Sequence, residues 1–166
     1  VPFVRKDLLQ IAEAMIAKGV HPRLQTNGLA KRDDLEKLAG MGANDISISL
    51  DSLAAAMQDK INGGFEGSFE RALRTIANVN AVFPADSFCA LGCVLAPTNL
   101  KHVKALIRFA TAIGWYVSLV PAHTSTPLQP RSFCTYDGAL RFSDEQQREV
   151  KRLLEDVRQM RNAGFL

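Results

Sequence analysis

The sequence predicts an α/β fold with a parallel sheet, built as an incomplete (β/α) barrel of the TIM type. Two observations support this prediction. Amphipathic, helix-like segments alternate with short β-rich runs along the chain. One of those runs also places its apolar and polar side chains on opposite faces. Regular helix–strand alternation with right-handed crossovers produces a parallel sheet, and the two-faced strand favours a barrel.

The expected elements follow one another with short joints, and glycine often marks the end of a helix. We expect five helices and four strands: helices over 7–18, 33–41, 68–82, 99–113 and 143–163, strands over 21–27, 45–51, 88–95 and 115–121. Helix-ending glycines are expected at Gly19, Gly42, Gly114 and Gly164. Asn99 is an expected N-cap, and the residues from Ser143 to Gln146 have capping-box spacing.

The strand at 45–51 distinguishes a barrel from a doubly wound sheet. Its apolar face holds Ile46, Ile48 and Leu50, and its polar face holds Ser47, Ser49 and Asp51. Helices cover both faces of a doubly wound sheet, whose strands therefore read as continuous apolar runs. In a barrel the apolar side meets the outer helices, and the polar side lines the interior or the active-site mouth.

We expect residues 1–166 to form a single, partial barrel domain. The chain is 47% hydrophobic, which is enough apolar material for one core. Four strands cannot close a barrel, and a complete eight-unit barrel takes about 250 residues. A helix opens the chain without a preceding strand, and the chain stops where a fifth strand is expected. We therefore favour a fragment over an open partial barrel.

The segment 121–142 is unusually long for a connection inside a compact domain. It begins at the C-terminal end of a strand, which is the end where barrel enzymes place their active sites. We interpret it as a lid or binding loop, with a merely disordered insertion as the alternative.

Composition argues against several classes of partner. The net charge is +3, and basic residues alternate with acidic ones on the expected helices, which indicates solvated faces and no nucleic-acid partner. No run of about 18 apolar residues occurs, so no membrane partner is expected. Three cysteines in a chain of ordinary cytosolic composition argue against a disulfide framework and for a cytoplasmic protein.

Two strand ends hold candidate binding residues. The run Gln25-Thr26-Asn27-Gly28 offers a hydroxyl and an amide at the end of the first strand, although Asn-Gly is also a common turn. The run from Ser47 to Asp51 places hydroxyls and a carboxylate on one side, suited to a ribose or an amino-acid group. Alternatively, Asp51 caps the next turn and the serines fill a narrow interior.

The cysteines and histidines give weaker signals. Cys89 and Cys93 have the spacing that begins the C-x-x-x-C-x-x-C motif of a [4Fe–4S] cluster, but the third position of that motif, 96, is alanine. The two cysteines also lie in an expected strand, where four residues span about 13 Å, too far for ligands that must converge. We interpret them as buried strand cysteines, and Cys134 as a loop cysteine that is inert rather than reactive. His123 follows the fourth strand and is a candidate substrate contact.

Taken in order, these segments resemble the radical SAM (S-adenosylmethionine) family, in its branch of peptide- and cofactor-modifying enzymes. The resemblance covers nearly the whole chain to about residue 123. Its motifs are Pro2-Phe3-Val4-Arg5-Lys6-Asp7-Leu8, Gln25-Thr26-Asn27-Gly28, Ser47-Ile48-Ser49-Leu50-Asp51, Gly67-Ser68-Phe69-Glu70-Arg71-Ala72-Leu73, Ala96-Pro97-Thr98-Asn99-Leu100 and Leu119-Val120-Pro121.

The resemblance implies a six-unit partial barrel, a [4Fe–4S] cluster, and reductive cleavage of SAM to a 5′-deoxyadenosyl radical that abstracts hydrogen from a substrate. It implies a cofactor-facing set of Thr26, Asn27, Ser47, Ser49 and Asp51, with the backbone near Leu119 and Val120 facing the adenine. Gln25 and His123 are the candidate substrate contacts.

The chain departs from the family pattern at several positions. The cluster cysteines and the glycines of the G-G-E motif would precede residue 1, and Val1 stands where the glutamate would be. Asn62 stands near a position where many relatives have an arginine for the SAM carboxylate, and Gly92 replaces a frequent polar residue. We therefore expect no cluster and no catalysis from this chain alone, whereas the parent protein is expected to be an enzyme.

Two other readings remain open. A non-catalytic, degenerate half-barrel would act as a scaffold or associate with another copy through its open sheet edges. An unrelated barrel enzyme would use the long loop as a lid. The substrate is not identifiable from these residues.

Overall fold

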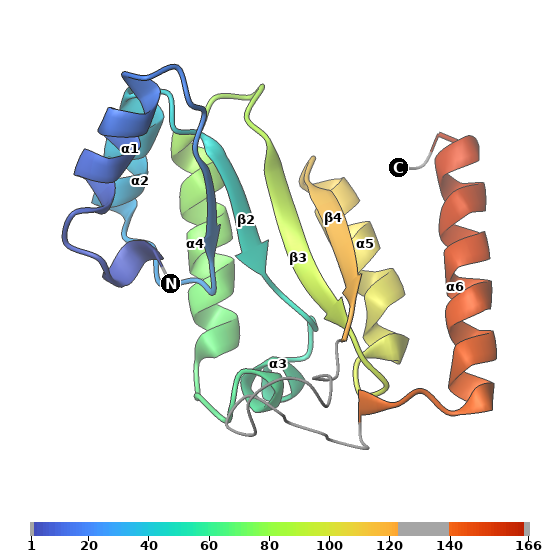
Figure 1. Cartoon of the computed structure of the whole chain (residues 1–166). Helices are drawn as coiled ribbons and strands as arrows, with labels where there is room; N and C mark the ends of the chain where they lie inside the picture. Colours follow the sequence, from blue (N-terminus) through green and yellow to red (C-terminus); the bar gives the residue numbers. More distant parts are fainter. Residues whose placement is uncertain (1, 123–139, 165–166) are drawn as a thin grey trace, which may run out of the picture.

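The computed structural model describes residues 2–122 and 140–164, and it contains one parallel sheet with helices packed against it (Figure 1). The strands are β1 (Arg23–Thr26), β2 (Asp45–Ser49), β3 (Cys89–Leu95) and β4 (Tyr116–Pro121). They lie side by side in chain order, and every neighbouring pair is parallel. A doubly wound sheet reverses its strand order at a switch point, and this sheet does not. The predicted α/β partial barrel of the TIM type is confirmed.

Six α-helices occur in the described residues, one more than expected. They are α1 (Leu8–Ile16), α2 (Arg32–Gly40), α3 (Ala55–Ile61), α4 (Ser68–Val82), α5 (Val103–Ala112) and α6 (Asp144–Asn162), with 3₁₀ turns η1 (Pro2–Val4) and η2 (Leu100–His102). The prediction missed α3, which has only seven residues and no side-chain N-cap. The expected loop at 121–142 lies mostly outside the described residues.

The predicted helix ends are largely confirmed. All four glycines named as helix ends have φ between 73° and 84°, a left-handed conformation that glycine adopts without strain. The capping box of α6 is also present, because Ser143 Oγ accepts from the Gln146 amide and Gln146 Oε1 accepts from the Ser143 amide. Asn99 precedes η2, but its side chain makes no capping hydrogen bond there.

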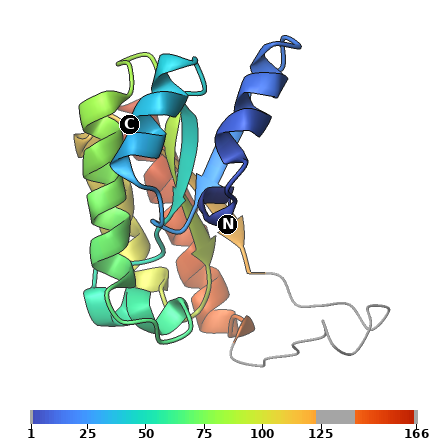
Figure 2. The same ribbon diagram turned by 90° about the vertical axis from the view of Figure 1, so that its left-hand side faces the viewer.

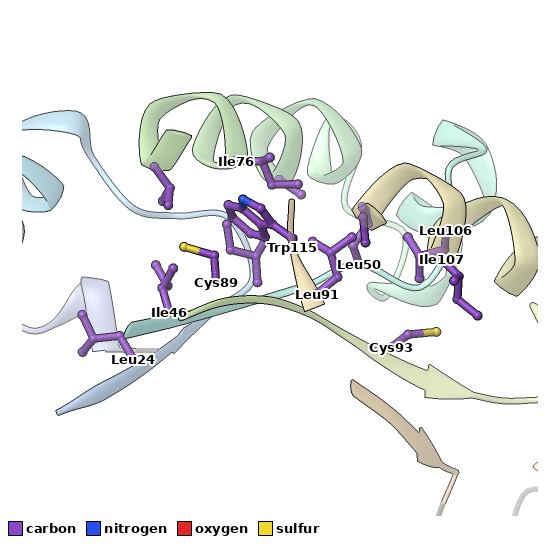
Figure 3. Packing of buried hydrophobic residues seen from close by; sticks show 14 of the residues in the cluster. Leu24, Ile46, Leu50, Ile76, Cys89, Leu91, Cys93, Leu106, Ile107 and Trp115 are labelled. Atoms are coloured by element: carbon purple, nitrogen blue, oxygen red, sulfur yellow. The ribbon is translucent and has the colours of Figure 1, made fainter. Parts of the chain in front are cut away.

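The hydrophobic core lies between the sheet and its helices (Figure 3). Ile46, Ile48 and Leu50 are fully buried on this side, as the alternation in β2 predicts. Leu91 of β3 and Leu106 of α5 belong to the same buried cluster; α4 contacts β2, whereas α5 contacts β3 and β4. Figure 2 shows α2, α3 and α4 together on one side of the strands.

The opposite face of the sheet is left largely open by the described residues. Val94, Tyr116 and Val120 are exposed there, at 49%, 62% and 41%. Helix α6 lies beyond α5 and is joined to the rest through the buried Leu153 and the ion pair between Lys104 and Asp156. Among the described residues, no helix is both long and apolar enough to span a bilayer.

Candidate functional site

Small and hydroxyl-bearing residues form a floor on the open face of the sheet. Parallel register places Ser47 opposite Ala90, and it places Gly92 between Ser49 and Ser118. Side chains of registered residues point to the same face, and the helix-facing side of β2 is already taken by its isoleucines. Ser47, Ser49, Ala90, Gly92 and Ser118 therefore form one surface, which we call the serine floor.

Gly92 keeps the centre of the serine floor flat. A Cβ built on this residue would lie 3.3 Å from Ser47 Oγ, a close contact for a Cβ atom. With glycine here, a flat group can approach the backbone of β3 between the hydroxyls of Ser49 and Ser118. A hydroxyl both donates and accepts, so such a surface suits a ribose or a heterocycle.

Gly92 and Ser118 extend the site beyond the residues predicted to contact the cofactor. From the sequence alone, Gly92 is a departure from the family pattern, and Ser118 is not among the predicted contacts. The signal for Ser118 was present in the strand alternation, because Tyr116, Ser118 and Val120 share one face.

The end of β1 holds two of the predicted residues, one at the open face and one with a buried side-chain oxygen. Gln25 is exposed and lies opposite Ser47 in the register, so it borders the serine floor. Asn27 Oδ1 is buried and accepts no hydrogen bond from the described residues. A buried acceptor without a donor is costly, which makes this oxygen available to a ligand or a water molecule.

Thr26 lies on the other side of β1. Only 2% of it is exposed, it shares the helix-facing side with Leu24, and its Oγ1 accepts from the Gly28 amide at 3.2 Å. Its hydroxyl stabilises the turn after β1, and its predicted cofactor contact remains a prediction.

Asp51 is buried at the end of β2, with 6% of its surface exposed. Its Oδ1 accepts from the Val94 amide at 2.7 Å. Burial raises the pKa of this carboxyl above its ordinary value, and the hydrogen bond from Val94 opposes that shift. The carboxylate therefore connects β2 to β3.

The predicted residues of β4 point in two directions. Val120 is opposite Val94 on the open face, whereas Leu119 is opposite Cys93 and points toward the helices. The side chain of Leu119 lines a cleft of ≈ 670 Å³ between α5, β4 and α6. The walls of this cleft are mostly apolar and lack converging polar groups, so we place the site at the serine floor. His123 lies outside the described residues.

Asn62 has a local partner in the turn between α3 and α4. Its Nδ2 donates to Ser68 Oγ at 3.1 Å, and Ser68 Oγ donates to Asp59 Oδ1 at 2.7 Å. Asp59 also accepts the Gly67 and Phe69 amides, which satisfies the N-terminus of α4. These hydrogen bonds lower the pKa of Asp59, the one from Ser68 most.

The two described cysteines are buried strand residues, as interpreted from the sequence. Cys89 and Cys93 lie apart in the core with Leu91 between them along β3 (Figure 3). Burial raises the pKa of Cys89 to about 11 and that of Cys93 to about 12, so both remain thiols near neutral pH. Residues 2–122 and 140–164 contain no group of three or more His, Cys, Asp or Glu side chains that could share a metal ion.

The other end of the open face carries an aromatic row. The Arg23 guanidinium lies 4.0 Å from the centre of the Phe88 ring, and Phe88 stacks on Tyr116 at 5.0 Å between ring centroids. Asp45 pairs with Arg23 at 3.3 Å. This row therefore occupies the N-terminal ends of the strands, and the serine floor lies farther toward their C-terminal ends.

The fold and the serine floor define a class of protein: a parallel (β/α) partial barrel whose candidate ligand surface lies on the open face of its sheet. The family described as the Radical SAM superfamily matches residues 1–110, which is more than half of the chain. The chain belongs to the radical SAM superfamily.

Several curated proteins are similar to this chain. An AdoMet-dependent heme synthase of Methanosarcina barkeri is 28% identical over 155 residues, covering 90% of this chain and 43% of its own length. A PqqA peptide cyclase of Methylocella silvestris is 26% identical, covering 68% and 30%. The mycofactocin maturase MftC of Mycobacterium tuberculosis is 30% identical, covering 69% and 28%. The chain thus spans less than half the length of these relatives.

Proposed function

We propose that this chain forms part of the SAM-binding face of a radical SAM enzyme. The flat centre of the serine floor at Gly92, with hydroxyls on either side, is the observation that supports this proposal most directly. SAM, when bound, supplies the 5′-deoxyadenosyl group that the family's chemistry releases as a radical for hydrogen abstraction.

The chain's own residues would bind and orient that group. Ser47 and Ser49 offer hydroxyls that can donate to and accept from a ribose, and Asn27 Oδ1 offers an acceptor that has no donor among the described residues. Gln25 borders the floor from β1, where a substrate would approach. These contacts act by holding the reacting group in a fixed orientation.

The family also implies a [4Fe–4S] cluster, but the described residues do not fit one. Cluster iron requires thiolates that converge, whereas Cys89 and Cys93 remain protonated, and both point into the core. We assign no cluster ligand among the described residues.

A binding measurement tests the cofactor assignment. In the full-length protein that contains this chain, Ser49→Ala should weaken SAM binding about three- to tenfold, which corresponds to one hydrogen bond. Ser87→Ala is the matched control, because Ser87 Oγ is buried just before β3, away from the floor, and has no hydrogen-bond partner among the described residues. Isothermal titration calorimetry gives both affinities.

A reaction assay tests the chemistry. The same protein, reconstituted anaerobically with iron and sulfide, should release 5′-deoxyadenosine from SAM and a reductant. A wild-type protein that neither binds SAM nor releases 5′-deoxyadenosine would overturn the proposal, and the non-catalytic scaffold would then become the leading alternative.

A further inference from the structure

The backbone pairing of β2 and β3 ends close to the serine floor. Ser49 and Gly92 are the last registered pair, and the Leu50 amide donates to the Gly92 carbonyl at 2.9 Å. Strand β3 continues to Leu95, so the peptide groups of Val94 lie beyond the end of the ladder. Partners for these groups must therefore come from side chains or water.

Two side chains take the place of the missing strand. Asp51 Oδ1 accepts from the Val94 amide at 2.7 Å, and Asn99 Nδ2 donates to the Val94 carbonyl at 2.8 Å. Asn99 also donates to the Asp51 carbonyl at 3.1 Å and accepts from the Ala96 amide at 2.9 Å. Only 1% of Asn99 is exposed, so water competes little for these hydrogen bonds.

Gln58 of α3 holds the same segment from its other side. Its Oε1 accepts from the Asp51 amide at 2.8 Å and from the Ser52 amide at 3.0 Å. The residue is fully buried, and its Nε2 has no acceptor among the described residues. A buried donor without an acceptor is unfavourable, so the contribution of this side chain comes from its oxygen.

We propose that Asp51, Gln58 and Asn99, which we call the strand-end clasp, are positioning residues for the serine floor. The proposal rests on the proposed function, in which this floor binds SAM. Ser49 lies two residues before Asp51, so the clasp fixes the backbone from which the Ser49 hydroxyl projects. Binding groups need such support, because a small displacement removes much of their effect.

Gln58 provides a matched pair of variants in the full-length protein. Gln58→Met keeps the volume but leaves the Asp51 and Ser52 amides without an acceptor. Gln58→Glu keeps an oxygen at that point in either protonation state. Leu38→Ala, in the core of α2, destabilises the fold without removing any clasp hydrogen bond.

SAM affinity is measured by calorimetry at a temperature where circular dichroism shows every variant folded. We expect Gln58→Met to raise the Kd for SAM about tenfold, which corresponds to about 1.4 kcal/mol. Gln58→Glu and Leu38→Ala should stay within about twofold of wild type, because both keep an acceptor for the Asp51 and Ser52 amides.

The outcomes separate this inference from the proposed function. If Gln58→Met leaves the SAM affinity at its wild-type value, the clasp proposal alone is overturned. The same holds if Leu38→Ala weakens SAM binding as much as Gln58→Met does. A wild-type protein without SAM affinity overturns both. Amide hydrogen exchange adds a readout that needs no ligand: the Asp51 and Ser52 amides should exchange faster in Gln58→Met than in Gln58→Glu.

Discussion

Asp51 shows how far a residue can be interpreted from a strand pattern. The alternation in β2 places Asp51 on the polar side, where its carboxylate is expected either to bind a ligand or to cap the next turn. In the structure the carboxylate accepts from Val94 of the neighbouring strand. A periodic pattern indicates a face, but it contains no information on which backbone amide of another strand lies within reach.

The charge on Asp51 should make stability depend on pH. Its pKa in the folded protein is raised by burial, so the protonated form is favoured on folding. The associated stabilisation is fully present below the ordinary pKa of an aspartate. It is lost as the pH rises through the folded value.

Asp51→Asn removes this charge and keeps an oxygen for the Val94 amide. Relative to wild type, the variant should therefore gain stability as the pH rises from acid to neutral, measured by urea unfolding across that range. A difference in unfolding free energy that does not change with pH would contradict the buried-charge argument. SAM affinity should survive the substitution, whereas a direct carboxylate contact would not.

For Thr26, the strand alternation and the polar side chain point to opposite faces of the sheet. Leu24 and Thr26 lie two residues apart in β1, and Leu24 is an obvious core residue. Alternation alone therefore places Thr26 on the helix side. The hydroxyl suggests a polar surface, but its oxygen is buried and accepts a hydrogen bond from the Gly28 amide.

At the scale of elements, long periodic segments were predictable and α3 was not. Helix α4 was placed at 68–82 from sequence, and its bounds are Ser68–Val82. Helix α3 is too short to display a period and has no N-cap side chain. Its position depends on Gln58, whose hydrogen bonds reach the end of β2 and are invisible in a linear pattern.

The turn after β1 packs its backbone directly onto α4. Gly28 has φ of 97°, and a Cβ added there would lie 2.7 Å from the Ala72 amide nitrogen. Thr75 Oγ1 donates to the Gly28 carbonyl at 2.8 Å, which fixes the approach. The sequence showed a turn-forming Asn-Gly, but the close contact with a helix over 40 residues later depends on tertiary structure.

Gly28→Ala should destabilise the protein by at least about 3 kcal/mol, because the methyl group adds steric overlap with backbone to left-handed strain. Gly19→Ala is the control: φ is 73° there as well, but a Cβ would meet nothing within 4 Å. It should cost about 1–2 kcal/mol. Equal losses in urea unfolding would show that the contact with α4 is unimportant.

At the scale of the whole molecule, strand order distinguishes the architectures that share helix–strand alternation. The two-faced pattern of β2 predicted a barrel-like sheet, and the uninterrupted order from β1 to β4 confirms it. The serine floor was only partly predictable, because it requires β2, β3 and β4 in register. Ser47 and Ser49 follow from one strand, but Gly92 and Ser118 join them only through pairing.

In the 166-residue chain, local unfolding should be more frequent at the edge of the sheet than at its centre. Strands β2 and β3 are central and include the fully buried Ile46, Ile48 and Leu91, whereas β4 is an edge strand without a buried residue. Amides of β4 that pair with β3 should exchange at least about tenfold faster than those in β2 and β3, because edge opening breaks fewer contacts than global unfolding.

Hydrogen exchange followed by mass spectrometry gives these rates strand by strand, and mild urea serves as the control. As urea approaches the unfolding midpoint, the rates of all strands should converge on the global opening rate. If β4 instead exchanges as slowly as β2, its edge must be covered in solution. Sedimentation at several protein concentrations would then show whether a second copy of the chain covers it, because association between copies depends on concentration.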